Sequence, residues 1–128
     1  MIVDTSAVLA ILRGEADAPR IARVLQEARI CRISAASYVE AAIVTDSNRD
    51  PVLSRRFDDL LRDGEIDIEL FDAVQAKIAR EAYRDFGKGR HRAGLNFGDC
   101  FSYALAKEKN EPLLFKGNDF RHTDVEPA

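Results

Sequence analysis

Short apolar segments alternate with longer amphipathic ones along the whole chain, and this order restricts the fold more than any other feature. Strands are expected at 2–3, 30–34, 66–70 and 112–115, with a short edge strand at 124–126. Between them, apolar residues recur at the spacing of α-helices. Strands that alternate with helices form parallel sheets joined by crossover helices. We therefore expect an α/β fold with a mostly parallel sheet and helices on both of its faces.

Signals that start and end helices mark the amphipathic segments. Asp50 followed by Pro51 is a cap with a first-turn proline, Ser34 and Asn96 are further caps, and Gly64 ends a helix. The helices expected from these signals cover 7–12, 17–28, 35–45, 51–63, 72–86 and 97–109. A basic loop with several glycines, 87–96, precedes the last of them.

The length of 128 residues predicts a single domain over 1–128 with room for a real core. No apolar run approaches the roughly 20 residues of a membrane helix, and no basic segment precedes the apolar start. Neither a membrane span nor a secretory signal is therefore expected. Cys31 and Cys100 are isolated and form no CxxC or disulfide framework, which suits a reducing compartment. These features predict a cytoplasmic protein.

Four acidic residues occupy positions that bring them to one edge of the expected sheet. Asp4 follows the first strand, Asp119 follows the strand at 112–115, and Glu40 lies in the helix after the second strand. Asp99 lies in the first turn of the helix that leads into the strand at 112–115. Because sites in parallel sheets form at the carboxyl ends of the strands, we expect these side chains to converge.

Each acid also has a purely structural explanation. Asp4 and Asp99 could serve only as caps or first-turn acids, and Asp119 could be only a turn residue. Glu40 is harder to explain in this way, because its helical neighbours Ala36, Ile43 and Val44 are apolar. No lysine or arginine lies between residues 35 and 48, so a structural role would require a salt bridge to a distant arginine.

Acids gathered in one place would repel one another unless a cation lay between them. Carboxylate oxygens without histidine or cysteine favour Mg²⁺ or Mn²⁺ over zinc. Such an ion keeps several waters, which can bind phosphate oxygens or supply a nucleophile. The net charge of −3 weighs mildly against a nucleic-acid-binding protein, but acids gathered around cations would make that total misleading. The hypothesis is a metal-dependent phosphoryl or phosphodiester enzyme.

Three segments resemble one protein family. MIVDTSAVLAIL at the start, NFGDCFSYALA near the end and LLFKGNDF after it are similar to PIN-domain proteins of the VapC-type ribonuclease toxin branch. The resemblance implies a PIN-like three-layer fold, with a central, mainly parallel sheet of four or five strands flanked by helices. It also implies the toxin of a type II toxin–antitoxin module, an endoribonuclease dependent on Mg²⁺ or Mn²⁺ that cuts tRNA, rRNA or mRNA.

The resemblance assigns roles to individual residues. Asp4 and Asp99 match metal ligands, and Glu40 and Asp119 match the further acids of a four-residue catalytic set. A metal-polarised water would attack the phosphorus in line, with Glu40 or Asp119 aiding its deprotonation, and the 3′-oxygen would leave. Thr5 and Ser6 match hydroxyl positions that support the first aspartate by hydrogen bonds.

The chain departs from the family pattern beside Asp119. Many relatives carry a hydroxyl residue two places before the fourth acid, where this chain has Gly117. The role of Asp119 is therefore the least defined of the four.

The resemblance also implies partners. These are a second copy of the chain in a homodimer and a VapB-type antitoxin whose C-terminal segment would cover the acidic pocket. An apolar groove for that segment could come from the first two helices, although core packing is an alternative role for most of its members: Leu9, Leu12, Ile21, Val24 and Leu25. The cations expected to guide RNA phosphates are Lys88, Arg90, Arg92 and Lys116, with a solvated charged loop as the alternative.

Three other functions remain open. A receiver-type phosphoacceptor domain would place an acceptor such as Asp72 after a central strand and Lys116 after a late one. A metal-independent ribonuclease could use His91 and His122 as an acid–base pair. A catalytically silent binding module would leave the acids without a chemical role.

Overall fold

Four short strands form one sheet, and every neighbouring pair of strands runs parallel. The computed structural model describes residues 1–128. The sheet order is β3-β2-β1-β4. The strands are β1 (Ile2–Val3), β2 (Cys31–Ser34), β3 (Ile66–Glu69) and β4 (Leu113–Leu114). The expected α/β fold with a central parallel sheet is confirmed, and the sheet has four strands.

Six α-helices connect or follow these strands. They are α1 (Thr5–Leu12), α2 (Ala18–Glu27), α3 (Ala35–Asp46), α4 (Pro51–Asp63), α5 (Ala73–Phe86) and α6 (Phe97–Lys109). Asp50 caps α4 by accepting from the Val52 amide at 3.0 Å, as expected. Ser34 precedes α3, but its hydroxyl makes no capping hydrogen bond, so that part of the expectation is wrong. No helix combines the length and apolar character needed to cross a bilayer.

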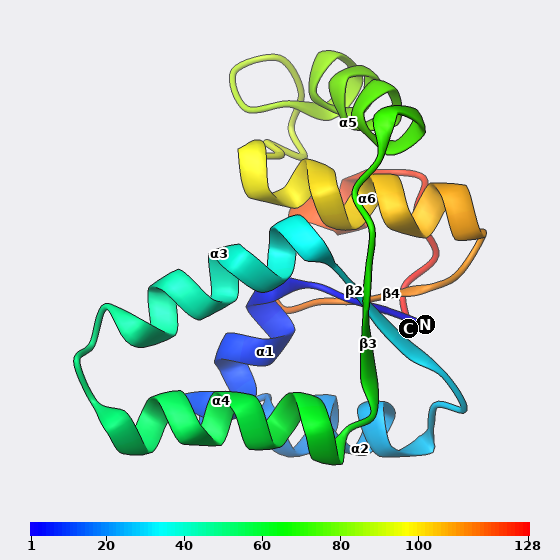
Figure 1. The fold of residues 1–128 in the computed structure, drawn as a ribbon. Coiled ribbons are helices and arrows are strands. Elements are labelled where there is room, and N and C mark those ends of the chain that lie inside the picture. Colours follow the sequence, from blue (N-terminus) through cyan, green and yellow to red (C-terminus); the bar gives the residue numbers. More distant parts are fainter.

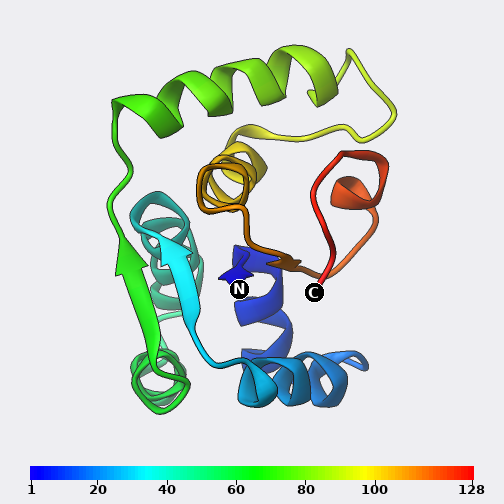
Figure 2. The same ribbon diagram turned by 90° about the vertical axis from the view of Figure 1, so that its right-hand side faces the viewer.

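The two faces of the sheet carry separate apolar cores. Ile2 and Leu113, which are paired in register, join the core beneath α5 and α6. Val3 and Leu114, one residue further along, join the core beneath α1, α2 and α4. Successive strand residues point to opposite faces, so even two-residue strands supply both cores. Figures 1 and 2 show these two layers of helices on either side of the sheet.

The segment at 124–126 is not a strand, which corrects the expectation of a final edge strand. After β4 the chain forms the 3₁₀ helix η1 (Asp119–His122) and then a tail that meets β4 at one bridge, between Leu113 and Pro127. Asp124 is held by α6 instead, because it accepts from the Tyr103 hydroxyl at 2.7 Å and from Lys107 Nζ at 2.9 Å. These contacts join residues far apart in sequence, and no local pattern predicts them.

The topology places four chain segments at the same edge of the sheet. The chain leaves β1 toward β2 on one side, whereas β4 lies on the other side of β1. The carboxyl ends of β1 and β4 therefore border a point where the strand order reverses, and in parallel sheets such points are the usual place for a ligand. Asp4 directly follows β1, and η1 follows β4. The beginnings of α3 and α6 pack nearby, as described below.

Candidate active site

Asp4 is fixed at the carboxyl end of β1 by the residues that follow it. Its carboxylate caps α1 and accepts from the Ser6 amide at 2.9 Å and the Ser6 hydroxyl at 2.5 Å. The same hydroxyl accepts from the Lys116 amide at 3.0 Å, just after β4. Thr5 donates its hydroxyl to the Ser37 carbonyl of α3 at 3.2 Å. Thr5 and Ser6 thus join α1 to α3 and to β4, and Ser6 also orients Asp4.

Asp99 both caps α6 and lies close to the other acids. The Asn96 side chain accepts from the Asp99 amide at 2.9 Å, and Asp99 Oδ2 accepts from the Asn96 amide at 2.9 Å. This reciprocal pair is a capping box, which fixes one carboxylate oxygen of Asp99. The structural role considered for Asp99 is therefore real, and it leaves the other oxygen free.

Glu40 extends from α3 across the first turn of α6. A Cβ atom on Gly98 would lie 2.7 Å from the Glu40 carboxyl carbon and 2.9 Å from Oε1, and closer still to Oε2. Glu40 forms no ion pair, so the alternative of a salt bridge to a distant arginine is wrong. The half-buried Glu40 carboxylate is therefore placed by packing against Gly98 and not by a cationic partner.

Asp119 is the most exposed member of the set. It begins η1, just beyond the carboxyl end of β4, and its side chain is exposed. Its position in a turn matches the structural explanation considered for it, and its charge nevertheless acts on Asp99.

The pKa of Asp99 shows that all four carboxylates share one region. Burial raises this pKa most, and the hydrogen bond from the Asn96 amide partly opposes the rise. The negative charges of Asp4, Asp119 and Glu40 then raise it further, to about 7 from an ordinary value of 3.8. A carboxylate whose pKa is raised by three neighbouring acids lacks a compensating cation, which is the electrostatic situation expected of an acidic metal site.

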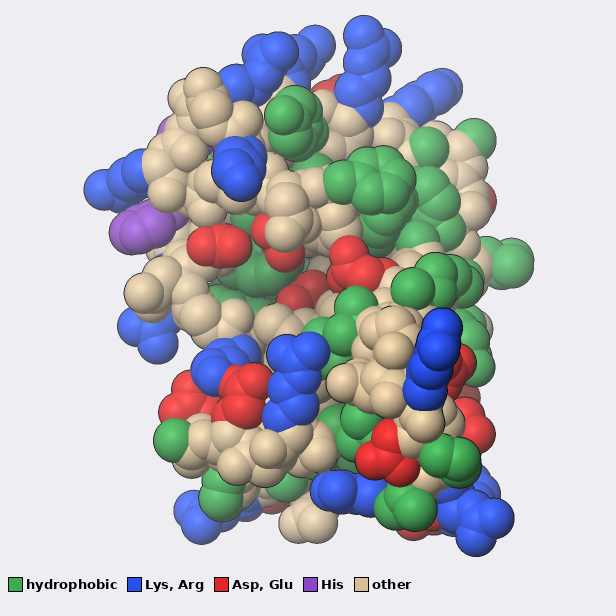
Figure 3. All heavy atoms as spheres, turned by 90° about the vertical axis from the view of Figure 1, so that its left-hand side faces the viewer, with side chains coloured by type: hydrophobic (Ala, Val, Ile, Leu, Met, Phe, Trp, Pro, Cys, Tyr) green, Lys and Arg blue, Asp and Glu red, His purple; other side chains and the backbone are tan.

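Figure 3 shows acidic side chains in a hollow near the middle of the face where α1 and α6 begin, with lysines and arginines around its rim. The carboxylates do not form a ready-made cage, since no three acidic, histidine or cysteine side chains are grouped closely enough to hold one ion. The donors are nevertheless all hard oxygens, which suit an ion that retains part of its water shell. The residues therefore fit a hydrated Mg²⁺ or Mn²⁺ in their chemistry.

The basic residues predicted to bind RNA fall into two groups. Lys88, Arg90 and Arg92 are exposed and form no ion pair, and the Arg90 guanidinium lies 5.9 Å from the Tyr83 ring centre. Lys116, in contrast, uses its ammonium group to pair with Glu15 of the turn after α1. The loop residues are therefore better placed than Lys116 to meet a phosphate.

The groups required by the alternative functions are already used within the fold. His91 accepts from the Ala93 amide at 3.1 Å and packs edge-on against Phe86, which gives it a structural role within the basic loop. Asp72, the acceptor needed by a receiver domain, caps α5 by accepting from the Gln75 amide at 2.9 Å. Both arrangements weigh against the histidine pair and the phosphoacceptor.

The apolar groove predicted on the first two helices is largely core. Leu12, Ile21 and Leu25 are at most 5% exposed. Leu9 and Val24 are only half-buried. The alternative of core packing is therefore confirmed for the three buried residues.

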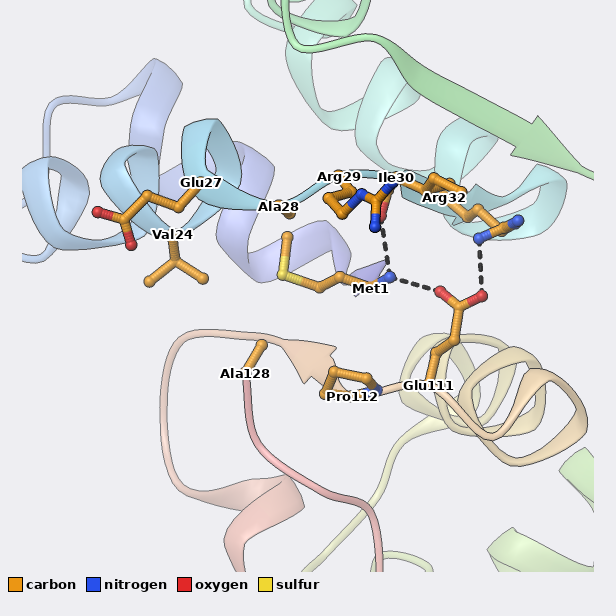
Figure 4. A pocket seen from close by; sticks show the side chains of 10 residues that line it. All are labelled: Met1, Val24, Glu27, Ala28, Arg29, Ile30, Arg32, Glu111, Pro112 and Ala128. Atoms are coloured by element: carbon orange, nitrogen blue, oxygen red, sulfur yellow. Dashed lines mark hydrogen bonds and ion pairs between the residues drawn. The ribbon is translucent and has the colours of Figure 1, made fainter.

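A large hollow lies away from the acids, at the opposite edge of the sheet. It measures about 840 Å³, and Figure 4 shows Met1, Arg32 and Glu111 at its centre. The Met1 ammonium donates to the Ile30 carbonyl at 2.9 Å and pairs with Glu111, which also accepts from Arg32 at 2.7 Å. These charges compensate one another, so this hollow has the character of a structural ion-pair network.

Two features that support the acidic site were not predicted from the sequence. Gly98 gives Glu40 the room to lie against α6, and the hydroxyls of Ser37 and Ser102 join α3 to α6 at 3.1 Å, with both serines fully buried. A glycine directly before an acid in a helical first turn was the available signal for Gly98. The serine pair joins positions 65 residues apart and has no local signature.

Comparison with known proteins places this geometry in context. The family model described as PIN domain matches residues 1–126. Ribonuclease VapC28 of Mycobacterium tuberculosis is 58% identical over 129 aligned positions, which cover 100% of this chain and 97% of the relative. Ribonuclease VapC42 of the same species is 49% identical, with 100% and 98% covered.

Solved structures with low identity support the fold alone. The M. tuberculosis toxin VapC20, described as cleaving the Sarcin-Ricin loop, aligns with a TM-score of 0.77 at 17% identity and covers 99% of this chain and 97% of that one. A chain of a toxin–antitoxin complex from Klebsiella pneumoniae aligns with a TM-score of 0.73 at 14% identity, with 96% and 92% covered.

Proposed function

The chain belongs to the PIN-domain family, and from this membership we propose that it is a VapC-type toxin, an endoribonuclease that hydrolyses RNA phosphodiester bonds. The observation that carries the proposal is that the charges of Asp4, Glu40 and Asp119 all act on Asp99 at the carboxyl edge of the sheet. Asp4 is buried and Asp99 is partly buried, and neither pairs with a cation; such carboxylates are costly to a fold, which favours a catalytic role.

Asp4 and Asp99 are proposed as the principal metal ligands, with Glu40 and Asp119 completing the acidic set. A bound Mg²⁺ or Mn²⁺ would stabilise negative charge on the phosphate and lower the pKa of a coordinated water. The ligand roles rest on rigidity: Ser6 holds Asp4, and the capping box with Asn96 holds Asp99. Prearranged ligands reduce the reorganisation needed when charge develops in the transition state.

Glu40 is proposed to accept a proton from the water that attacks the phosphorus. Its carboxylate makes no ion pair within the protein and is only partly buried, so a water molecule can reach it. Asp119 is the second candidate for this step, and its exposed position on η1 leaves it open to solvent and substrate. The bond to the 3′-oxygen breaks as the new bond forms on the opposite side of the phosphorus.

Lys88, Arg90 and Arg92 are proposed to guide the RNA backbone toward the acids. Unpaired surface cations attract phosphates and give binding that weakens with salt. The substrate is proposed to be a cellular RNA of the tRNA, rRNA or mRNA class.

A VapB-type antitoxin and a second copy of the chain are the proposed protein partners. The antitoxin is proposed from family membership and from the VapC relatives that share 49–58% identity with this chain. The homodimer is supported by large apolar side chains that are exposed on α3, on the edge strand β3 and directly after β3: Val39, Ile43, Ile68 and Leu70. Such exposed apolar residues favour contact with another protein surface.

The proposed activity is tested by mapping the ends of total RNA after incubation with the protein. We expect new ends with Mg²⁺ or Mn²⁺ present and none with EDTA. Asp99→Ala should abolish cleavage, whereas Glu126→Ala, a change at an exposed acid in the tail that bonds the start of β4, should leave it unaltered. Equal cleavage in EDTA, or by Asp99→Ala, would contradict the proposal.

A further inference from the structure

Gly98 lies where a side chain would collide with Glu40. A Cβ atom there would come within 3 Å of the Glu40 carboxyl carbon and both carboxylate oxygens, far below ordinary contact distance. Gly98 itself is buried in the first turn of α6, directly before Asp99. The Glu40 carboxylate therefore lies in space that only a glycine at position 98 leaves open.

The backbone does not require a glycine at this position. The glycines with positive φ are Gly14, Gly89, Gly94 and Gly117, and Gly98 is not among them. Alanine is more favourable than glycine within a helix, so local stability also favours a different residue. The feature of glycine that matters at position 98 is therefore its missing side chain and not its backbone freedom.

A buried contact between α3 and α6 brings Glu40 over Gly98. The hydroxyls of Ser37 and Ser102 meet at 3.1 Å, and both side chains are fully buried. Glu40 follows Ser37 by three residues and Gly98 precedes Ser102 by four, so each pair lies on one face of its helix. The serine contact therefore fixes which part of α6 lies under Glu40.

We propose that Gly98 is a positioning residue for Glu40: the missing side chain lets the Glu40 carboxylate lie against α6 beside Asp99. This inference rests on the proposed function, because it assigns Gly98 a part in assembling the acidic metal site.

Gly98→Ala should alter the acidic site without unfolding the protein, because the atoms that its methyl group would displace are at the far end of a flexible side chain. Glu40 is only half-buried and can turn toward solvent without disturbing the core. The fold should keep its stability or gain a little from the better helix former. The acidic site, however, should lose the Glu40 carboxylate, as it does in Glu40→Gln.

The experiment compares wild type, Gly98→Ala, Glu40→Gln and the double variant. Melting temperature and Mn²⁺ affinity, by calorimetry on the metal-free protein, are measured beside RNA cleavage. We expect Gly98→Ala to melt at or above the wild-type temperature and to bind Mn²⁺ roughly 10–100-fold more weakly, the usual effect of losing a supporting contact at a metal site. The double variant should bind Mn²⁺ as weakly as Glu40→Gln does, because the carboxylate that Gly98→Ala would displace is already absent from it. Phe97→Ala, an adjacent exposed position, is the control and should keep wild-type Mn²⁺ affinity.

Wild-type Mn²⁺ affinity in Gly98→Ala, or fully additive losses in the double variant, would overturn the inference. So would a crystal structure of Gly98→Ala in which the Glu40 side chain has not moved, a result independent of metal and activity. A wild-type protein that cleaves no RNA would refute the proposed function, while the crystal structure and melting temperatures would still decide the role of Gly98.

Discussion

Asp99 combines a structural and a chemical role in one carboxylate. Its Oδ2 atom completes the capping box with Asn96, which stabilises the start of α6. Its pKa of about 7, raised first by burial and then by Asp4, Asp119 and Glu40, reveals the cost of placing it among the other acids. The sequence left open whether Asp99 is a cap or a site residue. Asp99 is placed for both, because its Oδ2 accepts the capping hydrogen bond from Asn96 while the carboxylate lies within the influence of the other three acids.

Asp99→Asn should remove part of the pH dependence of stability in the metal-free protein. Because the folded-state pKa is raised, the favourable contribution of protonated Asp99 is complete below pH 3.8 and is lost as the pH rises through about 7. The free energy of unfolding of wild type should therefore fall between about pH 4 and 7, and that of Asp99→Asn should fall less. Urea denaturation in EDTA at several pH values measures both. Parallel curves for the two proteins would show that the pKa of Asp99 is not raised in the folded protein.

Ser6→Ala should loosen Asp4 while leaving every acid in place. The Ser6 hydroxyl donates to Asp4 at 2.5 Å and accepts from the Lys116 amide at 3.0 Å, so its removal leaves polar groups without partners. We expect a loss of about 0.5–1.5 kcal/mol in unfolding free energy and roughly 10–100-fold weaker metal binding. Chemical denaturation and calorimetry provide the measurements. Ser47→Ala, which removes an exposed hydroxyl from the end of α3, is the matched control and should change neither.

The convergence of the acids was predictable, whereas the role of Gly98 was not. Asp4, Asp99 and Asp119 adjoin strand ends or the helix leading to a strand, and parallel topology brings such positions to one edge. Gly98 acts through Glu40, 58 positions earlier in the chain, and helix propensity alone marks it as unfavourable. Local sequence patterns therefore predict which acids converge, but not that Gly98 leaves the space for Glu40.

The helices agree with their predicted ranges more closely than the strands do. Caps such as Asp50 and Asp72 act on amides two or three residues away, so the sequence contains the whole interaction. The strand expected at 112–115 is limited to Leu113–Leu114, since a strand extends only as far as its neighbours pair with it. The tail at 124–126 was wrongly expected to be a strand because Tyr103 and Lys107 of α6 compete for Asp124.

Tyr103→Phe should release this tail from α6. Burial raises the pKa of Tyr103 and Asp124 raises it further, while Asp124 has a lowered pKa because Tyr103 and Lys107 outweigh the opposite effect of burial. Losing the phenolic hydroxyl removes a charge-assisted hydrogen bond, for which we expect a loss of about 1.5–3 kcal/mol in unfolding free energy. Amide exchange at 124–128 should accelerate, while exchange in α1 remains as in wild type. Unchanged protection of the tail would indicate that the bridge between Leu113 and Pro127 suffices to hold it.

Charged groups are paired at the amino edge of the sheet, whereas acidic groups at the carboxyl edge have no cationic partners. At the amino edge, the Met1 ammonium and Arg32 both pair with Glu111, and Arg32 also reaches Glu69, the last residue of β3, at 2.9 Å. Burial alone would raise the pKa of Glu111, but these cations outweigh it and the pKa is lowered. At the carboxyl edge, the pKa of Asp99 is raised. Lys116, two residues after β4, pairs with Glu15 and with none of the four acids. The fold thus compensates its charges at one edge and leaves negative charge unbalanced at the other.

A divalent cation should therefore stabilise the whole molecule, and more strongly at high pH than at low pH. An ion that binds only the folded state adds about 2.7 kcal/mol when present at 100 times its dissociation constant. Since Asp99 must lose its proton to bind, and its pKa is about 7, the increase in melting temperature with Mn²⁺ should be larger at pH 8 than at pH 6. Scanning calorimetry with and without MnCl₂, at matched ionic strength, measures the difference. Asp4→Asn should lose most of the increase, whereas Glu126→Gln should keep it. An equal increase in Asp4→Asn would mean that the stabilising ion binds elsewhere on the molecule, and the uncompensated carboxyl edge would then need another explanation.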